Sequence, residues 1–346
     1  MQASAELGFL VEVYRTGEKI SLGLGETTRN YSGFLRSVRF SFLGRQIQFT
    51  LIPMKILRSR YIVMEHKLSD LSIVLMLLFL PSKVVLWGHG ESLTTLDTSI
   101  VSYLRILLAR RAKMYLAYTE DGANYLIENG VKSKSIKVLV NTLDTEELMR
   151  AKKDLKSKSI KNFESKFKLE NKRVVAYVGA LEPYKKIDLI IEAFQILSEE
   201  NFDVTCFFLG TGSQKQYLES QDRIHFILLD RGCAAEKAML AYFAKCFLMP
   251  GRIGLIAIDS IYLERVILTT EWPFHAPEFR YLTPGRDVIV SESNPRAYAN
   301  NIKNVFINSG LIEKYENNLR DLQSSFSGSK MVGNFLEAIA SLEKIS

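Results

Sequence analysis

The sequence has few residues that could bind a metal or build a disulfide framework, with only three cysteines and four histidines among 346 residues. Cys206, Cys233 and Cys246 lack metal-binding spacing, and we interpret them as free thiols in a reducing compartment. Residues 71–81, the longest apolar block, are too short to span a bilayer and predict a buried helix. The N-terminus lacks the basic start and apolar core of a secretion signal, so we expect a cytoplasmic protein.

Two common kinds of anion-binding motif are also missing. No glycine-rich run ends in Gly-Lys-Ser or Gly-Lys-Thr, which excludes a P-loop. No recognised nucleic-acid motif is present, so we expect no nucleic-acid partner. The net charge of +7 nevertheless indicates an anionic partner, and a nucleotide or a phospholipid surface would provide one.

Strand-like and helix-like segments alternate along the chain, which is 47% hydrophobic. In the first half, where residues 20–40 look irregular, we predict strands at 10–13, 61–64, 84–87, 114–118 and 136–140, and helices at 42–57, 68–80, 100–113 and 121–129. In the second half we predict strands at 174–178, 204–209, 225–229, 246–249, 266–269 and 287–290, again with helices between them. This alternation predicts an α/β fold of two Rossmann-like domains facing each other across a cleft.

Residues 146–173 differ from both halves, because they are rich in lysine and poor in large apolar residues. We interpret them as a helix and a connector between domains, although a solvated charged face would have the same composition. We therefore place a first domain at 1–150, a basic connector at 151–172, a second domain at 173–325 and a C-terminal helix at 326–346.

One stretch of the second half, residues 249–278, has the pattern of an anion site. An apolar strand ends before a glycine-bearing turn, and a helix begins near Gly254 and Leu255. Free backbone N–H groups and the helix dipole would then point at the same ligand. Asp259 lies one turn further on and could accept a hydrogen bond from a sugar hydroxyl, and Glu278 follows in the next loop. The alternative is one more strand–helix–strand unit that only packs the core.

A second candidate loop, residues 179–186, follows the first strand of the second half. A lysine at the carboxyl end of such a strand, here Lys185, could reach a diphosphate in the cleft. The alternative is a solvated surface lysine. Gly210 and Gly212 form a predicted turn beside the same cleft.

These segments resemble a known family. The sequences VGALEPYKK at 178–186 and LIIEAF at 189–194 are similar to the signature of retaining, family-4-type glycosyltransferases of the GT-B fold. Residues 250–260 and 277–279 resemble its donor-binding region. Residues 87–90, 118–120 and 141–144 resemble its N-terminal half, most closely in bacterial O-antigen and capsular polysaccharide enzymes. The resemblance extends from about residue 60 to about 295, with the motifs in the same order.

The resemblance implies a reaction. A nucleotide-diphosphate sugar would bind mainly to the second domain. A hydroxyl of a glycan or polyprenyl-linked saccharide, held by the first domain, would attack the anomeric carbon from the face that the nucleotide leaves. The anomeric configuration would be retained. No metal and no cofactor are expected, so cations and helix N-termini must take up the leaving charge.

The resemblance also implies roles for individual residues. Lys185 would contact the diphosphate and act in catalysis together with His89, which would face the reacting sugar. The amides of Gly254 and Leu255 would hold a phosphate, and Asp259 stands where the family usually has a ribose-binding glutamate. The other implied positions are Gly179, Gly210, Gly212 and Glu278 on the donor side, and Glu91, Glu120 and Asn141 on the acceptor side.

Several of these residues also have structural alternatives. Asp259 could cap or solvate a helix, and Glu120 could be an ordinary carboxylate at a helix N-terminus. We interpret the remaining histidines, His66, His225 and His275, as structural. Trp272 and Phe274 are interpreted as loop packing.

The chain departs from the family pattern at several places. Ala180 stands where the family usually has an arginine, Gly251 stands at the first of its paired glutamates, and Glu264 and Val266 replace a glycine and a proline. The family fold also begins with a central strand, and we expect this first strand to be missing or rearranged. The alternative function is therefore a non-catalytic GT-B relative that binds a nucleotide sugar or a partner enzyme.

A peripheral membrane contact is a further expectation. The helix predicted at 100–113 carries Arg105, Arg110 and Arg111, and residues 71–80 are strongly apolar. Together these segments could seat the protein on an anionic membrane surface.

Overall fold

The computed structural model describes residues 11–16, 32–42, 45–91, 99–221, 226–230 and 232–344. They form two compact units. Unit 1 contains the described residues up to Asn141 together with those from Ser329 onward, and unit 2 contains Thr142–Gly328. The chain thus changes unit at residue 141 rather than near 150. Residues 151–172, predicted as a connector, contain the end of α6 (Thr145–Lys153) and all of α7 (Ser157–Phe167), which belong to unit 2.

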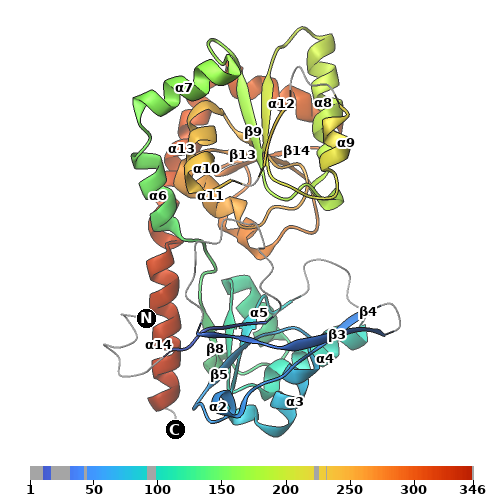
Figure 1. Cartoon of the computed structure of the whole chain (residues 1–346), viewed down its shortest axis with the longest axis vertical. Helices are drawn as coiled ribbons and strands as arrows, with labels where there is room; N and C mark the ends of the chain where they lie inside the picture. Colours follow the sequence, from blue (N-terminus) through green and yellow to red (C-terminus); the bar gives the residue numbers. More distant parts are fainter. Residues whose placement is uncertain are drawn as a thin grey trace. The chain divides into compact units, whose positions relative to one another are not determined.

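Among the described residues, unit 1 is built on four parallel strands in sequence order: β5 (Ile62–Glu65), β6 (Val84–Gly88), β7 (Met114–Ala117) and β8 (Ile136–Val138). Three helices connect them: α3 (Leu71–Phe79), α4 (Ser99–Arg111) and α5 (Glu120–Glu128). Because parallel crossovers are right-handed and the strand order never reverses, these helices form one layer on one face. Val84 and Leu86 pack under this layer, whereas Val85 packs against α14 (Gly328–Lys344) on the other face (Figure 1).

The beginning of unit 1 corrects the sequence prediction. A helix at 42–57 was expected, but β3 (Ser37–Phe42) and β4 (Arg45–Thr50) form an antiparallel hairpin, followed by the short α2 (Met54–Leu57). Residues 11–13 are not a strand, and β1 (Tyr14–Thr16) instead pairs with β2 (Gly33–Leu35).

The pattern misled because the buried face of β4 is polar. Gln48 Nε2 and Thr50 Oγ1 donate to Asp70 Oδ2 at 3.2 and 2.9 Å. The other carboxylate oxygen, Asp70 Oδ1, accepts from the N–H of Ser72 and caps α3. Buried polar groups are tolerated when they are hydrogen-bonded to one another, as here. Apolar alternation could therefore not reveal this strand.

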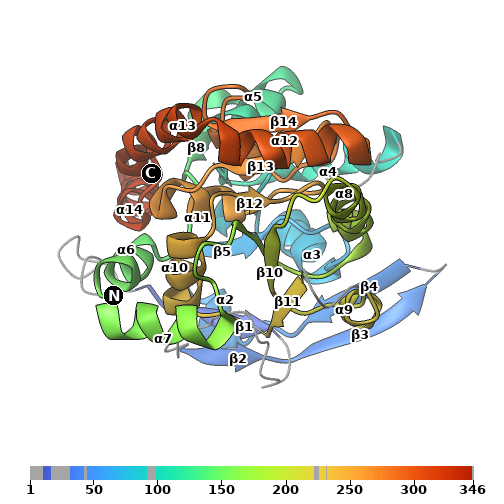
Figure 2. The same ribbon diagram turned by 90° about the horizontal axis from the view of Figure 1, so that it is seen from above.

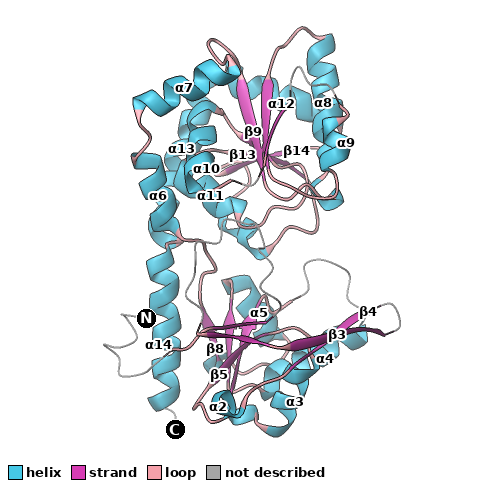
Figure 3. Ribbon diagram, in the orientation of Figure 1, coloured by secondary structure: helices cyan, strands magenta, loops and turns pink. Residues whose placement is uncertain are grey.

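Unit 2 has six described parallel strands in the order β11-β10-β9-β12-β13-β14. Their bounds are β9 (Val174–Val178), β10 (Thr205–Leu209), β11 (Phe226–Leu229), β12 (Phe247–Leu248), β13 (Ile267–Thr270) and β14 (Val288–Ser291). Strands β9 and β10 are buried along their whole length, as their continuous apolar runs predicted. Figure 3 shows strands and helices alternating in both units, which confirms the predicted α/β class.

Helices cover both faces of this sheet. Helices α8 (Ile187–Glu199) and α12 (Pro295–Ile307) pack together on one face. On the other face, α10 (Ala234–Phe243) and α11 (Ile256–Leu263) pack against α6, and α11 also contacts α13 (Ser309–Leu322) (Figure 2). The chain runs outward from β9 to β11 and then returns to the other side of β9 with β12. The carboxyl ends of β9 and β12 therefore form the topological switch point, where ligands bind in such sheets.

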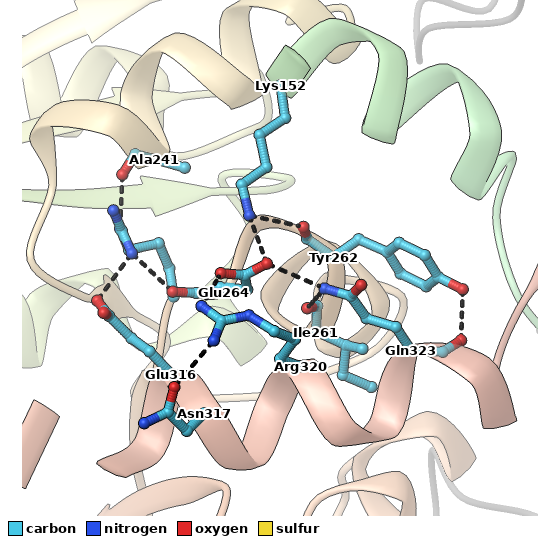
Figure 4. A network of polar contacts seen from close by, with 10 residues as sticks. Lys152, Ala241, Ile261, Tyr262, Glu264, Glu316, Asn317, Arg320 and Gln323 are labelled. Atoms are coloured by element: carbon cyan, nitrogen blue, oxygen red, sulfur yellow. Dashed lines mark hydrogen bonds and ion pairs between the residues drawn. The ribbon is translucent and has the colours of Figure 1, made fainter. Parts of the chain in front are cut away.

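A network of hydrogen bonds and ion pairs joins three helices of unit 2 at Glu264, the residue that follows α11 (Figure 4). Glu264 has left-handed backbone angles, φ 55° and ψ 48°, at a place where a glycine would be unstrained. Its carboxylate accepts from Lys152 Nζ of α6 and Arg320 Nη2 of α13, both at 2.7 Å, and from Gln323 Nε2 at 3.3 Å. This glutamate thus ties α6 and α13 to α11.

We expect Glu264→Gln to lower the free energy of unfolding by about 2 kcal/mol at pH 7. Burial alone would raise the pKa of Glu264, but hydrogen bonds from Arg320 and Lys152, together with their charges, lower it to about 2. Because the folded pKa lies below the ordinary value of 4.5, the stabilisation is complete above pH 4.5 and is lost as pH falls toward 2.

Urea unfolding at pH 7 and pH 3 measures this effect. Glu313→Gln, an exposed carboxylate on α13, is the control and should change neither value. Equal stability of Glu264→Gln and the parent protein at pH 7 would contradict the prediction.

Candidate functional site

Three loops of unit 2 meet at the switch point. They follow β9, β12 and β13, which are neighbours in the sheet. The N–H of Arg252 donates to the carbonyl of Tyr184 at 3.0 Å, which joins the first two loops. The N–H of Ile253 donates to His275 Nδ1 at 3.0 Å, and the N–H of Ala276 returns to the carbonyl of Ile253 at 2.8 Å. The segments predicted separately as candidate sites are thus brought together.

Gly251 is the closest point between two of these loops. A Cβ atom built on it would lie 2.3 Å from the carbonyl oxygen of Tyr184 and 2.7 Å from Cα of Lys185. No side chain fits there without moving backbone. The acidic residue that the family resemblance suggests at this position therefore has no room in this chain, and Arg252 is the first side chain that the loop presents.

Lys185 and Arg252 place two cations side by side. Lys185 Nζ donates to the carbonyl oxygen of Arg252 at 2.5 Å, and Arg252 Nη1 donates to the carbonyl of Phe274 at 2.8 Å. Burial, and then the charge of Arg252, lowers the pKa of Lys185 to about 8. Burial also lowers the pKa of Arg252, whereas the charge of Glu278 acts to raise it. The arrangement concentrates positive charge and is suited to bind an anion with more than one negative charge.

His275, interpreted from sequence as structural, borders this pair. Burial, together with the charges of Arg252 and Lys185, lowers the pKa of His275 to about 4, although a backbone hydrogen bond with Thr270 acts to raise it. It is therefore neutral near pH 7, with Nδ1 accepting from Ile253 and the ring lying 3.9 Å from that of Phe279. His275 thus fixes the loop that carries Arg252. The sequence analysis did not assign His275 to the site. The one indication in the sequence was its position in the loop that follows a strand.

The remaining predicted donor-side residues have varied surroundings. Glu278 is buried in the short helix Pro277–Tyr281, near Arg252. Gly254 and Leu255 directly precede α11, and the binding of a phosphate by their amides stays a prediction. Gly210 and Gly212 pack closely on the loop that begins at Gly179, where Cβ atoms would meet the carbonyl oxygens of Gly179 and Leu181. These two glycines thus shape the loop behind Lys185.

Asp259 forms an ion pair within the chain that the sequence did not indicate. It is 4% exposed, and Lys237 Nζ of α10 donates to both of its carboxylate oxygens at 3.0 and 2.8 Å. Burial raises the pKa of Asp259, while Lys237 acts to lower it. This ion pair joins α10 to α11. In the structure the Asp259 carboxylate binds Lys237, and its contact with a ribose stays a prediction.

Unit 1 has its own cluster at the carboxyl ends of β5 to β7. His89 lies in the loop after β6, with its ring 4.5 Å from that of Tyr118. The N–H of Gly90 donates to the hydroxyl of Tyr115 at 3.1 Å, which anchors this loop. The same hydroxyl lies 3.0 Å from Nδ1 of His66, a residue that sequence reasoning interpreted as structural. Burial and the nearby Arg105 lower the pKa of His66 to about 4.

The predicted acceptor-side residues lie around this cluster. Glu91 is half-buried and lies two residues after His89. Glu120 is exposed in the first turn of α5, which fits the alternative that it is an ordinary carboxylate at a helix N-terminus. Thr119 caps that helix. Asn141 follows β8, and its N–H donates to the carbonyl of Tyr118 at 3.0 Å. All three thus lie at one edge of the unit 1 sheet.

The described residues contain no group of three or more His, Cys, Asp or Glu side chains placed to hold a metal ion. Nor does any helix in the described ranges combine the length and apolar character needed to cross a membrane.

Residues 158–321, just under half of the chain and almost all of unit 2, match the family model described as Glycosyl transferases group 1. No curated protein matches the sequence.

Solved structures are similar over most of the chain. HepE of Anabaena, solved in complex with UDP, is 14% identical with a TM-score of 0.64, covering 81% of this chain and 79% of HepE. Its complex with UDP-glucose gives 15% identity and a TM-score of 0.61, covering 82% and 78%. A glycosyltransferase from Rickettsia africae is 15% identical with a TM-score of 0.60, covering 76% and 71%. This likeness shows the GT-B fold, and the family match shows that residues 158–321 are similar to the group 1 glycosyltransferase domain.

Proposed function

We propose that this protein transfers a sugar from a nucleotide-diphosphate donor to a hydroxyl group of a glycan or lipid-linked acceptor, with retention of anomeric configuration and without a metal. The observation that carries the proposal is the cation pair of Lys185 and Arg252 at the switch point of the matched domain. The HepE complexes contain UDP and UDP-glucose, which makes uridine diphosphate the first nucleotide to test. The free thiols of the chain fit a cytoplasmic location.

In this proposal the two cations neutralise the diphosphate as the bond to the sugar breaks. Lys185 and Arg252 come from neighbouring loops, so they can contact different phosphate oxygens. Arg252 thereby supplies the second positive charge that the family resemblance would place at Ala180. The amides of Gly254 and Leu255 add the N-terminal end of α11 to the same site. Charges fixed before the reaction stabilise a developing anion without reorganisation.

The acceptor side of the proposal rests on unit 1. His89 is held by an anchored loop and a ring contact with Tyr118, so its position is well defined. We assign it to face the reacting sugar, with Glu91, Glu120 and Asn141 on the acceptor side. The resemblance to O-antigen and capsular polysaccharide enzymes makes a bacterial glycan, carried on a polyprenyl lipid, the proposed acceptor.

A non-catalytic relative is the second candidate, and two observations favour it. Gly251 leaves no room for an acidic side chain, and Asp259 is engaged by Lys237. Such a protein would bind the nucleotide sugar without turning it over. Release of free nucleotide from the donor, measured with a range of acceptors, separates the two candidates.

Thermal unfolding in the presence of nucleotides tests the donor site first. The panel contains uridine, guanosine, thymidine, adenosine and cytidine diphosphates, each with and without a sugar. A ligand at about one hundred times its dissociation constant should stabilise the protein by roughly 2.7 kcal/mol. One strongly stabilising nucleotide supports the proposal and names the base. A cooperative transition that no nucleotide shifts would reject the donor-site assignment.

Donor affinity should fall with rising pH. The pKa of Lys185 is about 8 in the free protein, and a bound diphosphate must raise it, because the anion favours the protonated amine. Above pH 8 the protein must therefore take up a proton to bind, and the affinity for the diphosphate should fall about tenfold between pH 7 and pH 9.

Titration calorimetry at several pH values measures this dependence. Lys185→Arg keeps the charge throughout this range and should show a much flatter profile. An equally steep profile in that variant would assign the dependence to another group.

A further inference from the structure

Helix α4 presents an apolar face to solvent. Ile100 is 72% exposed and Tyr103 64% exposed, and Leu104 and Leu107 are exposed on the same side. The spacing of three and four residues places all four on one stripe. The opposite side of the helix, with Ile106, Leu108 and Ala109, is buried against the sheet. The helix is therefore apolar on both sides, although only one of them is packed by unit 1.

Helix α3 repeats this arrangement. Residues 71–81 were expected to form a buried helix, but Leu71, Leu75, Leu78 and Phe79 are exposed, Phe79 at 77%. Burial is confined to the side that includes Ile73 and Leu77. The prediction was thus wrong for half of the helix. A surface helix of a protein that stays in water normally carries polar residues on this outer side.

The two exposed faces adjoin. Helices α3 and α4 pack against each other in the layer that covers one face of the unit 1 sheet (Figure 1). At their ends, Arg111 Nε and Nη2 donate to the carbonyls of Leu77 and Leu78 at 3.2 and 3.4 Å. We call the eight exposed apolar residues of α3 and α4 the apolar face. These residues form a group, whereas exposed apolar side chains on protein surfaces are normally scattered singly.

The two helices that carry this face contain charges of only one sign. Neither α3 nor α4 contains an aspartate or glutamate, whereas α4 carries three arginines. The exposed stripe of α4 ends in Arg110 and Arg111. Beside it, a groove of about 640 Å³ lies between α4 and α5, lined by Tyr103, Ile106 and Leu107 and bordered by Arg110 and Glu128. An apolar surface with a cationic border fits the boundary between acyl chains and anionic headgroups.

We propose that the apolar face of α3 and α4 binds the surface of an anionic phospholipid bilayer, with Leu, Ile and Phe side chains entering it and Arg110 and Arg111 meeting the headgroups. A second copy of the chain is a poorer occupant. In a two-fold interface the same patch faces itself, so arginines would meet arginines with no acid in either helix. The proposed function gives membrane binding its purpose, which is access to a lipid-linked acceptor. The observations that support membrane binding do not depend on that function.

Co-sedimentation with vesicles tests the proposal. Vesicles of equal parts phosphatidylglycerol and phosphatidylcholine should bind the protein, and pure phosphatidylcholine vesicles should bind it at least tenfold more weakly. Added salt should weaken binding to the anionic vesicles. The double variants Leu78→Gln/Phe79→Gln and Leu104→Gln/Leu107→Gln should each lower that binding at least tenfold. The control Ile307→Gln/Val332→Gln changes exposed apolar residues elsewhere and should bind normally.

Three results would overturn the proposal. They are no binding of the parent protein to anionic vesicles, equal loss in the control, and a dimer in light scattering that the α3 and α4 variants convert to monomer. The variants change exposed side chains, so stabilisation by nucleotides should be the same as in the parent protein. Failure of vesicle binding with intact nucleotide binding rejects only this inference, whereas absence of nucleotide binding rejects the proposed function.

Discussion

Replacing Lys185 with methionine should lower kcat/KM for sugar transfer by a hundredfold to a thousandfold, or about 2.7 to 4 kcal/mol of transition-state stabilisation. The lysine is half-buried, lies beside Arg252 and is held by the carbonyl of that arginine. The charge that develops on the departing diphosphate would then face Arg252 alone. Methionine keeps much of the side-chain volume, so the loss reports the charge rather than a cavity.

Lys186→Met is the matched control, because this neighbouring lysine points elsewhere. Its ammonium group lies over the ring of Trp272 and donates to Ser293. We expect kcat/KM of this variant to stay within about threefold of the parent value, since a hydrogen bond to a serine hydroxyl and a cation–π contact contribute little. Equal losses in both variants would mean that the loop, and not the charge of Lys185, is what matters.

Gly251→Ala should destabilise unit 2 by about 2 to 4 kcal/mol and should also reduce donor binding. The added methyl group would lie 2.3 Å from the carbonyl oxygen of Tyr184, so the backbone of one loop must move. Because Lys185 and Arg252 flank this contact, the movement separates the two cations. Thermal unfolding measures the first effect, and nucleotide titration measures the second.

Gly254→Ala provides the comparison three residues further on. There the added Cβ would meet only Ala276 Cβ at 3.6 Å, an ordinary contact distance. Its backbone N–H is kept, so we expect stability within about 0.5 kcal/mol of the parent protein. If Gly251→Ala were equally harmless, the close approach of the two loops would have no energetic importance.

The sequence predicted the strands of unit 2 well, because each is a short, continuous apolar run that a parallel sheet buries on both faces. Strand β9 was predicted with its observed bounds, and β13 was misplaced by one residue. The hairpin of unit 1 could not be found this way. Its inner positions, Gln48 and Thr50, are polar, and their hydrogen bonds to Asp70 and to each other make burial favourable.

The candidate site was predictable only where one segment contains the signal. Lys185 follows a strand, and this position, together with the family resemblance of its own segment, suggested its role. Arg252 lies 67 residues further along, and nothing in its own segment indicates that Lys185 donates to its carbonyl. The pairing of Asp259 with Lys237 was equally invisible, because it depends on how α10 and α11 pack.

The position of α14 in the chain has a consequence for synthesis. Its residues Ala338, Ile339 and Leu342 complete the core on the second face of the unit 1 sheet, against Val85 and Leu116. Unit 2 needs nothing beyond Gly328, and bonds from Thr142 to Phe326 and from Gly328 to Thr145 already join its two ends. On the ribosome, the later-made unit can therefore finish folding first. The earlier-made one must wait for the last helix to emerge.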